Sequence, residues 1–219
     1  MSLNVPASPN LALAPDTYQR PYADQANNIL RLYFNQISST LQALTGRAGG
    51  RYLNFPYAAI QRTTDKTFTA NTATQITFNQ NDYLNYCANS GTDGIQVTYS
   101  GIYNYQFSIQ FANTDSQIQG AWVWLRKNGV DVPGTGSRWD ITAKHGSSDG
   151  YVVAAANFFV QLVAGDTVEM WAAVSQAYNP VTPTTGVYME AYAAQTVPFA
   201  MPSIPSVVAT LSFVSEIPS

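Results

Sequence analysis

The sequence has few charged residues: Asp, Glu, Lys and Arg make up 11% of the chain, whereas about 25% is usual in soluble domains. Uncharged Asn, Gln, Ser and Thr must therefore supply most of the surface polarity. Such a surface favours packing between identical copies, because burying amides and hydroxyls costs less than burying unpaired ions. With a net charge of −3, the chain also lacks a basic surface for phosphates, so we expect no nucleic-acid binding.

Cysteine and histidine are almost absent, since Cys87 and His145 are the only residues of their kinds. One cysteine excludes a disulfide within the chain, and one Cys with one His cannot supply the usual zinc ligands. The aspartates match no calcium-binding loop. A nucleophilic triad needs a histidine beside a Ser or Cys, and His145 lies in a segment of turn composition. We therefore predict no catalytic site, no cofactor and no metal site within one chain, and expect Cys87 to be half-buried.

Long apolar runs are also missing. No stretch approaches the roughly 18 apolar residues that cross a bilayer, so we expect no membrane insertion. Residues 1–22 instead carry four prolines (Pro6, Pro9, Pro15 and Pro21), which favour an extended arm over a packed element. Such an arm can dock onto a partner protein, and a disordered tail is the alternative.

A heptad pattern follows the arm and predicts a helical stalk over residues 23–46. Pro21 and Asp24 mark its start, and Gly46 marks its end. Large apolar residues recur at alternating steps of four and three, as in a coiled coil between copies. Two heptads are short, so the alternative is that this seam packs on the following domain. The predicted seam consists of Asn27, Leu30, Phe34, Ile37, Leu41 and Leu44.

After Arg51 the pattern changes to period two, which is typical of strands. From Ile95 to Phe111 the odd positions are mostly apolar, and a break at Ser100–Gly101 predicts two strands or one bent strand. The sequence thus predicts an all-β head over residues 51–219, with the alternating pattern of a sandwich or jelly roll. Further strands are predicted at Thr74–Phe78, Ala121–Lys127, Tyr151–Leu162, Thr167–Val174, Val187–Ala193 and Val207–Val214.

Tight turns are also visible in the sequence. Asn128–Gly129 predicts a two-residue hairpin, because both positions tolerate positive φ. Gly165–Asp166 predicts a turn into the following strand. Trp122 and Trp124 have the same parity, so we predict that they share one face of a strand, and that this face is packed.

Three segments occur in a characteristic order: a Gly-aromatic strand entry, a strand ending in a hairpin, and a Leu-x-x-Gly-Asp turn into a β-branched strand. They are Ser100–Phe107, Val123–Gly129 and Val160–Met170. Together they resemble the tumour-necrosis-factor and complement globular-head superfamily, and the resemblance implies a homotrimeric jelly roll. Members of this superfamily also occur as fibre heads and decorations on tailed bacteriophages. Residues 10–15 and 28–36 resemble the N-terminal parts of such phage proteins, which implies a location in the virion.

The polar segment around Trp139 is a candidate surface-binding loop. Trp139 lies between Arg138 and Asp140, and His145 follows in the same region. An indole can stack on a sugar ring while charged neighbours bond its hydroxyls, and His145 can contact a glycan or respond to pH. The alternatives are that Trp139 packs under its loop or against another subunit, and that His145 is simply solvated.

The main hypothesis is therefore a structural virion protein of a bacteriophage. It is a homotrimeric capsid decoration or fibre-like protein that docks onto capsid or tail proteins through residues 1–22 and projects the jelly-roll head. Several weak contacts on one particle act at high effective concentration, so attachment needs no deep pocket. A host-surface glycan is an additional candidate partner. The alternative is a carbohydrate- or receptor-binding module that works away from any particle.

Overall fold

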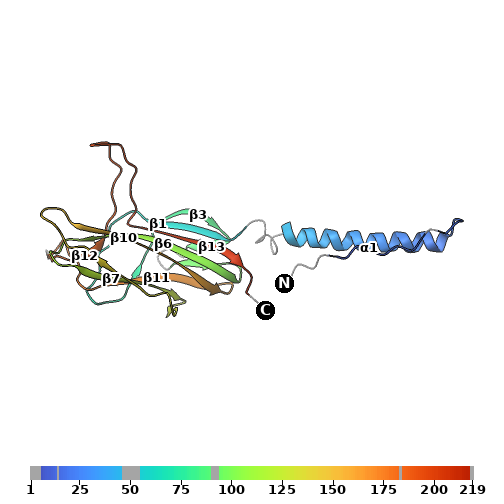
Figure 1. Ribbon diagram of the computed structural model, residues 1–219, viewed down its shortest axis with the longest axis horizontal. Coiled ribbons are helices and arrows are strands. Elements are labelled where there is room, and N and C mark those ends of the chain that lie inside the picture. Colours follow the sequence, from blue (N-terminus) through green and yellow to red (C-terminus); the bar gives the residue numbers. More distant parts are fainter. Residues whose placement is uncertain (1–5, 14, 46–54, 90–93, 183, 218–219) are drawn as a thin grey trace. The chain divides into compact units, whose positions relative to one another are not determined.

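The computed structural model describes residues 6–13, 15–45, 55–89, 94–182 and 184–217. The chain divides into two compact units, Met1–Phe55 and Pro56–Ser219. In the described residues, the first unit contains one helix, α1 (Arg20–Thr45), and the second contains strands, as Figure 1 shows. The predicted combination of one helix with an all-β head is therefore confirmed.

Helix α1 begins at Arg20, earlier than residue 23, where the sequence pattern places it. Pro21 thus lies in the first helical turn, where proline is tolerated because its missing N–H has no acceptor within the helix. Asp24 lies inside the helix and forms an ion pair with Arg20 (Nε to Oδ2, 3.7 Å). Gly46, the predicted end signal, lies outside the described residues. At about 1.5 Å per residue, the 26 residues of α1 span roughly 39 Å.

The described part of the N-terminal arm has no helix or strand before Arg20 and runs beside α1 (Figure 1). The hydroxyl of Tyr22 donates a hydrogen bond to the carbonyl oxygen of Ala12 (2.7 Å). Nearer the other end of the helix, Pro6 and Ala7 line a groove with residues of α1. These helix residues are Leu32, Asn35, Gln36, Ser39 and Thr40. The arm therefore folds back along one side of the helix.

The second unit is a jelly-roll sandwich of two antiparallel sheets. Sheet A contains, in spatial order, β10 (Gly150–Leu162), β6 (Gly101–Asn113), β13 (Val207–Ser215), β1 (Tyr57–Arg62) and β3 (Gln80–Asn85), and β12 (Val187–Met189) also pairs with β6. Sheet B contains β4 (Cys87–Asn89), β5 (Ile95–Val97), β11 (Thr167–Val174), β7 (Gln119–Lys127) and β8 (Val130–Asp131), with β2 (Thr74–Ile76) on β11 and β9 (Ser137–Ile141) on β7. Neighbours in a sheet are mostly distant in sequence, as jelly-roll crossovers require.

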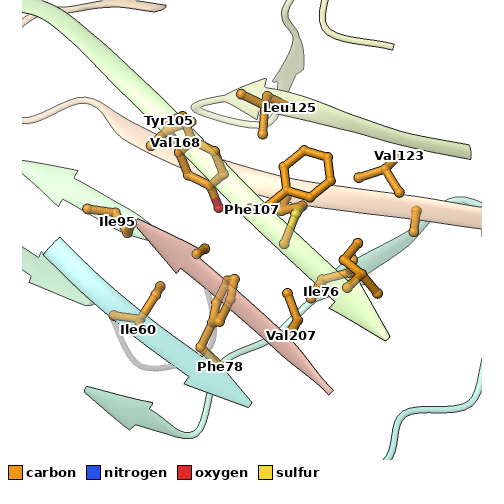
Figure 2. Close-up of a cluster of buried hydrophobic side chains, with 14 of the residues drawn as sticks. Ile60, Ile76, Phe78, Ile95, Tyr105, Phe107, Val123, Leu125, Val168 and Val207 are labelled. Carbon is orange, nitrogen blue, oxygen red and sulfur yellow. The ribbon is translucent and has the colours of Figure 1, made fainter. Parts of the chain in front are cut away.

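The core lies between the two sheets. Figure 2 shows Tyr105 and Phe107 of β6 grouped with Val123 and Leu125 of β7 and with Val168 of β11. Each of these side chains is at most 4% exposed. Burial of one such large apolar side chain contributes about 1.5–3 kcal/mol, so the alternating residues of the longest strands hold the sandwich together.

Two turns predicted from the sequence are present and contact each other. Asn128 and Gly129 join β7 to β8 with φ values of +50° and +79°. The carboxylate of Asp166 accepts hydrogen bonds from the Val163 N–H (2.9 Å) and the Asn128 side-chain amide (2.7 Å). The N–H of Thr167 in turn donates to the side-chain oxygen of Asn128 (2.8 Å). The hairpin turn thus caps the start of β11 in the same sheet.

Several strand predictions are confirmed and others are incomplete. Strand β11 has the predicted bounds, and the break at Ser100–Gly101 separates β5 from β6. The strand predicted at Val187–Ala193 ends already at Met189. Five strands have no predicted range, namely β1, β3, β4, β8 and β9, and of these only β8 is implied by the predicted Asn128–Gly129 hairpin.

Candidate functional site

The predicted seam of α1 is partly accessible within its own unit. Asn27 is exposed, Leu30 and Ile37 are half-buried, and Phe34 and Leu41 are 59% and 54% exposed. The side chain of Leu44 lies outside the described residues. Exposure of a large aromatic side chain along a helix is costly in water. A stalk between copies would relieve this cost, and it stays a prediction.

The N-terminal arm covers a different side of α1. A helix turns by about 100° per residue, so Phe34 and Gln36, which lines the groove beside Pro6, point to nearly opposite sides. The arm therefore leaves Phe34 accessible to another molecule. Docking of the arm onto a virion protein likewise stays a prediction.

The prediction of a loop around Trp139 is wrong. Strand β9 contains Arg138, Trp139 and Asp140. Trp139 points inward and packs on the core, with its ring centroid 6.1 Å from that of Phe107 at 74°. Arg138 and Asp140 point outward and form an ion pair of 2.8 Å. The indole of Trp139 and its charged neighbours therefore lie on opposite faces of the sheet, as one of the two alternatives for Trp139 implied.

His145 is exposed in the turn between β9 and β10. Its N–H donates to the carbonyl oxygen of Ser148 (2.9 Å), and the Ser148 N–H donates back to the carbonyl oxygen of His145 (3.1 Å). An ion pair between Lys144 and Asp149 (3.6 Å) flanks the turn. Arg138, Asp140 and His145 are thus exposed while Trp139 packs on the core, so the four candidate residues do not share one surface. Their binding role stays a prediction.

Trp122 and Trp124 share one face of β7, as predicted, but the prediction that this face is packed is wrong for Trp122, which is exposed, while Trp124 is half-buried. They alternate with the buried Val123 and Leu125 and lie on the outer face of sheet B. Trp122 is 36% exposed. Trp171 of β11 lies directly opposite Trp124 in the register. Three of the four tryptophans of the chain are therefore on this outer face.

Paired charges accompany these tryptophans. The guanidinium of Arg126 lies 3.8 Å from the ring centroid of Trp171, and its Nε donates to Asp131 (2.6 Å). The indole N–H of Trp124 donates to the same carboxylate (2.7 Å), and that of Trp171 donates to Glu169 (2.9 Å). Cation–π contacts and hydrogen bonds thus satisfy the polar groups of this face within the chain.

The electrostatics follow from these contacts. The hydrogen bond from Arg126, and then that from Trp124, lowers the pKa of Asp131 below its ordinary value of 3.8. Arg138 lies 5.5 Å from the centroid of Trp122 and binds Asp140. Trp122 itself lies over the backbone of Gly120, where a Cβ would come within 2.9 Å of the ring. The outer face of sheet B is therefore aromatic and charged, with the ion pairs Arg126–Asp131 and Arg138–Asp140 formed within the chain.

The outer face of sheet A has a different composition. Burial alternates along β10, β6, β13 and β1, so the outward residues of these four strands can be assigned from the register. None of them carries a charge, whereas the edge strand β3 carries the exposed Asp82, whose carboxylate accepts a hydrogen bond from the Gln61 side chain (2.7 Å). The outward residues of the four strands are Tyr151, Val153, Ala155, Asn157, Phe159 and Gln161 of β10; Ile102, Asn104, Gln106, Ser108, Gln110 and Ala112 of β6; Val208, Thr210, Ser212 and Val214 of β13; and Tyr57, Ala59 and Gln61 of β1.

Strand β10 is the edge of sheet A and carries the most exposed apolar residues of this face. Phe159 is 64% exposed, Val153 56% and Tyr151 51%. On the neighbouring strand, opposite Phe159, the side-chain oxygen of Asn104 is buried without a hydrogen-bond partner. Natural proteins usually blunt or cover long apolar edge strands, because these pair with other chains. The outer face of sheet A is thus suited to contact with another protein surface.

Among the described residues, no group of three or more His, Cys, Asp or Glu side chains is placed to hold a metal ion. Cys87 is half-buried against the core, as predicted, and burial raises the pKa of its thiol to about 12. Within the same residues, no helix combines the length and the apolar character that crossing a membrane requires.

The fold and these surfaces define an all-β jelly-roll protein with an N-terminal helical unit. No protein-family model and no curated protein matches the sequence. Similar solved structures include the globular domain of zebrafish complement 1qA, with 12% identity and a TM-score of 0.42 over 74% of this chain and 99% of the other. Another is the tumour-necrosis-factor protein Eiger from S. frugiperda, with 12% identity and a TM-score of 0.43 over 75% of this chain and 96% of the other. Both likenesses are distant, so the assignment of the fold rests on the strand order and register described above.

Proposed function

We propose that this chain is a structural virion protein of a bacteriophage that assembles as a homotrimer and decorates the capsid or forms part of a fibre. The observation that supports the homotrimer best is the outer face of sheet A. The outward residues of β10, β6, β13 and β1 are uncharged, and the edge strand β10 exposes Tyr151, Val153 and Phe159 to solvent.

Association through this face is energetically favourable for a simple reason. Each large apolar side chain that leaves water contributes about 1.5–3 kcal/mol. The outward residues of β10, β6, β13 and β1 bring no ion that must be desolvated, and their amides and hydroxyls can hydrogen-bond across the contact. A donor from a second copy would also satisfy the buried oxygen of Asn104. A copy of the same chain offers the same neutral chemistry, which a charged partner surface does not.

The N-terminal unit has two roles in this proposal. The arm, residues 6–13 and 15–19 in the described part, attaches to another virion protein. Helix α1 associates with the helices of the other copies through the side of Phe34, which the arm leaves accessible. No step of the proposal needs a catalytic site, a cofactor or a metal ion.

Two measurements test the proposal. Light scattering should give three times 23.8 kDa, about 71 kDa, for the native protein. A chain that lacks residues 1–19 should keep this mass but should no longer co-purify with the virions of the phage that encodes it. A native mass of 23.8 kDa would refute the trimer, and normal incorporation of the shortened chain would refute docking by the arm.

The outer face of sheet B favours a second candidate function, the binding of a saccharide or receptor. Trp122 is the most accessible of its three tryptophans, and the exposed pair Arg138–Asp140 lies beside it. Tryptophan and arginine are the residues that most often dominate binding surfaces. A glycan array should then show binding that Trp122→Ala abolishes and Val130→Ala, a change of another exposed side chain of sheet B, leaves intact. Absence of binding to every glycan would count against this candidate.

A further inference from the structure

The connection between β12 and β13 is a projecting hairpin, defined here as residues 191–205. Reciprocal backbone hydrogen bonds join Tyr192 to Ile204 (2.9 and 2.8 Å) and Gln195 to Met201 (3.0 and 2.9 Å). These two pairs have the same register, so the legs run antiparallel. At about 3.3 Å per residue, roughly seven residues per leg give a projection of roughly 20 Å.

The tip of the hairpin is apolar and accessible to solvent. Val197 is 79% exposed and Phe199 60% exposed, and Pro198 and Ala200 between and beside them are also exposed. No residue from 191 to 205 carries a charge. A solvated loop of this length normally contains charged residues, whereas an apolar tip on an uncharged stem is typical of a segment that contacts another protein.

The base of the hairpin is held firmly, which defines the direction of the projection. The Glu190 carboxylate accepts hydrogen bonds from the hydroxyls of Tyr188 (2.8 Å) and Tyr192 (2.6 Å). The N–H of Ala191 donates to Asp65 (2.8 Å), and the Ser206 hydroxyl donates to the carbonyl oxygen of Thr64 (2.8 Å). The stem is therefore fixed to the sandwich on both legs.

The hairpin connects two strands of sheet A and projects on the outer side of that sheet. Its legs continue β12 and β13, which both pair with β6 of that sheet. Figure 1 shows it, coloured brown to red, rising on the side of β1, β3 and β10 and away from β7 and β11. The hydroxyl of Tyr192 also interacts with Tyr151, the first outward residue of β10. The hairpin is therefore continuous with the uncharged outer face of sheet A.

We propose that the tip of the hairpin, residues 197–200, packs on a neighbouring copy of this chain in the homotrimer. This inference rests on the proposed trimer. A copy that covers the outer face of sheet A lies on the side to which the hairpin rises, so the hairpin contacts that copy. The neutral tip matches a neutral surface of another copy, whereas against the outer face of sheet B it would leave the charges of Arg138 and Asp140 without water. The contact runs from one copy to the next, as closed rings of identical subunits require.

Photo-crosslinking tests this contact directly in the full-length protein. A photoreactive phenylalanine analogue in place of Phe199 should crosslink chains to one another and yield dimers and trimers on a denaturing gel. The same analogue in place of Val130, which is 70% exposed on sheet B, is the control and should leave the chains as monomers. Light scattering before illumination confirms the assembly state of each protein.

A substitution gives a second readout. Val197→Asp together with Phe199→Asp should raise the dissociation constant of the trimer at least about tenfold, since charged groups enter a neutral contact. The circular-dichroism spectrum should stay that of the folded sandwich, because neither side chain is in the core. A trimer with no crosslink from position 199 and an unchanged dissociation constant overturns the hairpin contact alone. A monomeric wild-type protein overturns both this contact and the proposed trimer.

Discussion

The two outer faces of the sandwich have the same backbone pattern and opposite chemistry. The outer face of sheet B carries Trp122, Trp124 and Trp171 with paired charges such as Arg126 and Asp131. The outer face of sheet A carries no charge on β10, β6, β13 and β1 and exposes Phe159 on the edge strand β10. The first face satisfies its polar groups within one chain, whereas the second leaves apolar area in water. The comparison favours the outer face of sheet A as the contact in the proposed trimer.

The largest effect is expected from a charge placed on the outer face of sheet A. Val153→Asp would bury an unpaired carboxylate in the proposed contact, which costs several kcal/mol and should weaken the trimer by more than about 100-fold. The measurement is the mass by light scattering over a dilution series. Val130→Asp is the matched control on sheet B, because Val153 and Val130 are 56% and 70% exposed. If the Val153→Asp protein is folded and still trimeric, the outer face of sheet A is not part of the interface.

A smaller effect is expected from the helix. Phe34→Asp should weaken the trimer by about 1–2 kcal/mol, because one apolar side chain per copy is lost from a short seam. Sedimentation equilibrium can measure this change. Gln36→Asp, on the side of α1 that faces Pro6, is the control and should leave the association constant unchanged. Equal effects of the two substitutions would mean that Phe34 has no specific role in assembly.

On sheet B the expected effect concerns stability, with no effect on assembly. Arg126→Ala removes the cation over Trp171 and one donor to Asp131, so the free energy of unfolding should fall by about 1 kcal/mol. Arg138→Ala should cost less, because Arg138 is more exposed and lies 5.5 Å from the Trp122 centroid. Urea unfolding measures both values, and light scattering should show unchanged trimers. Dissociation of either variant would contradict the division of roles between the faces.

The smallest effect is a pH dependence confined to sheet B. Because the pKa of Asp131 is lower in the folded chain than its ordinary 3.8, its interactions stabilise the fold above that value and are lost as the pH falls through the folded pKa. Asp131→Asn should therefore lower the free energy of unfolding near neutral pH. At lower pH the free energies of unfolding of the variant and the native protein should become more similar. Thermal melts between pH 7 and pH 3 measure this, and parallel curves for the two proteins would contradict it.

The strands that sequence reasoning located are those with a clear local pattern. Strand β11 alternates Val168, Met170 and Ala172 with more polar neighbours, and the Asn128–Gly129 turn marks the end of β7. Strand β3 was missed, because its residues are mostly polar and exposed at the edge of sheet A. Strand β9 was missed as well, because Arg138 and Asp140 give it the composition of a loop.

The candidate binding surface was only partly predictable for the same reason. Trp139 was assigned to a polar loop, yet it packs on Phe107 because β9 pairs with β7 and turns alternate residues inward. The tryptophan ladder of sheet B and the neutral outer face of sheet A involve residues far apart in sequence, such as Trp124 and Trp171. Arg126 has the same parity as Trp122 and Trp124 and therefore lies on the same face of β7. Its charge was the signal in the sequence that this face points to solvent.

The sequence alone determined the class of fold, the helix and which residues share a face of a strand, because these follow from periodicity and turn chemistry within a few residues. Only the tertiary structure decided which face of each strand is buried. In β7 both alternating sets are apolar, Val123 with Leu125 and Trp122 with Trp124, and in β10 the outward Phe159 is as apolar as the inward Phe158. The choice depends on how the two sheets pack on each other, and that packing involves strands from the whole length of the chain.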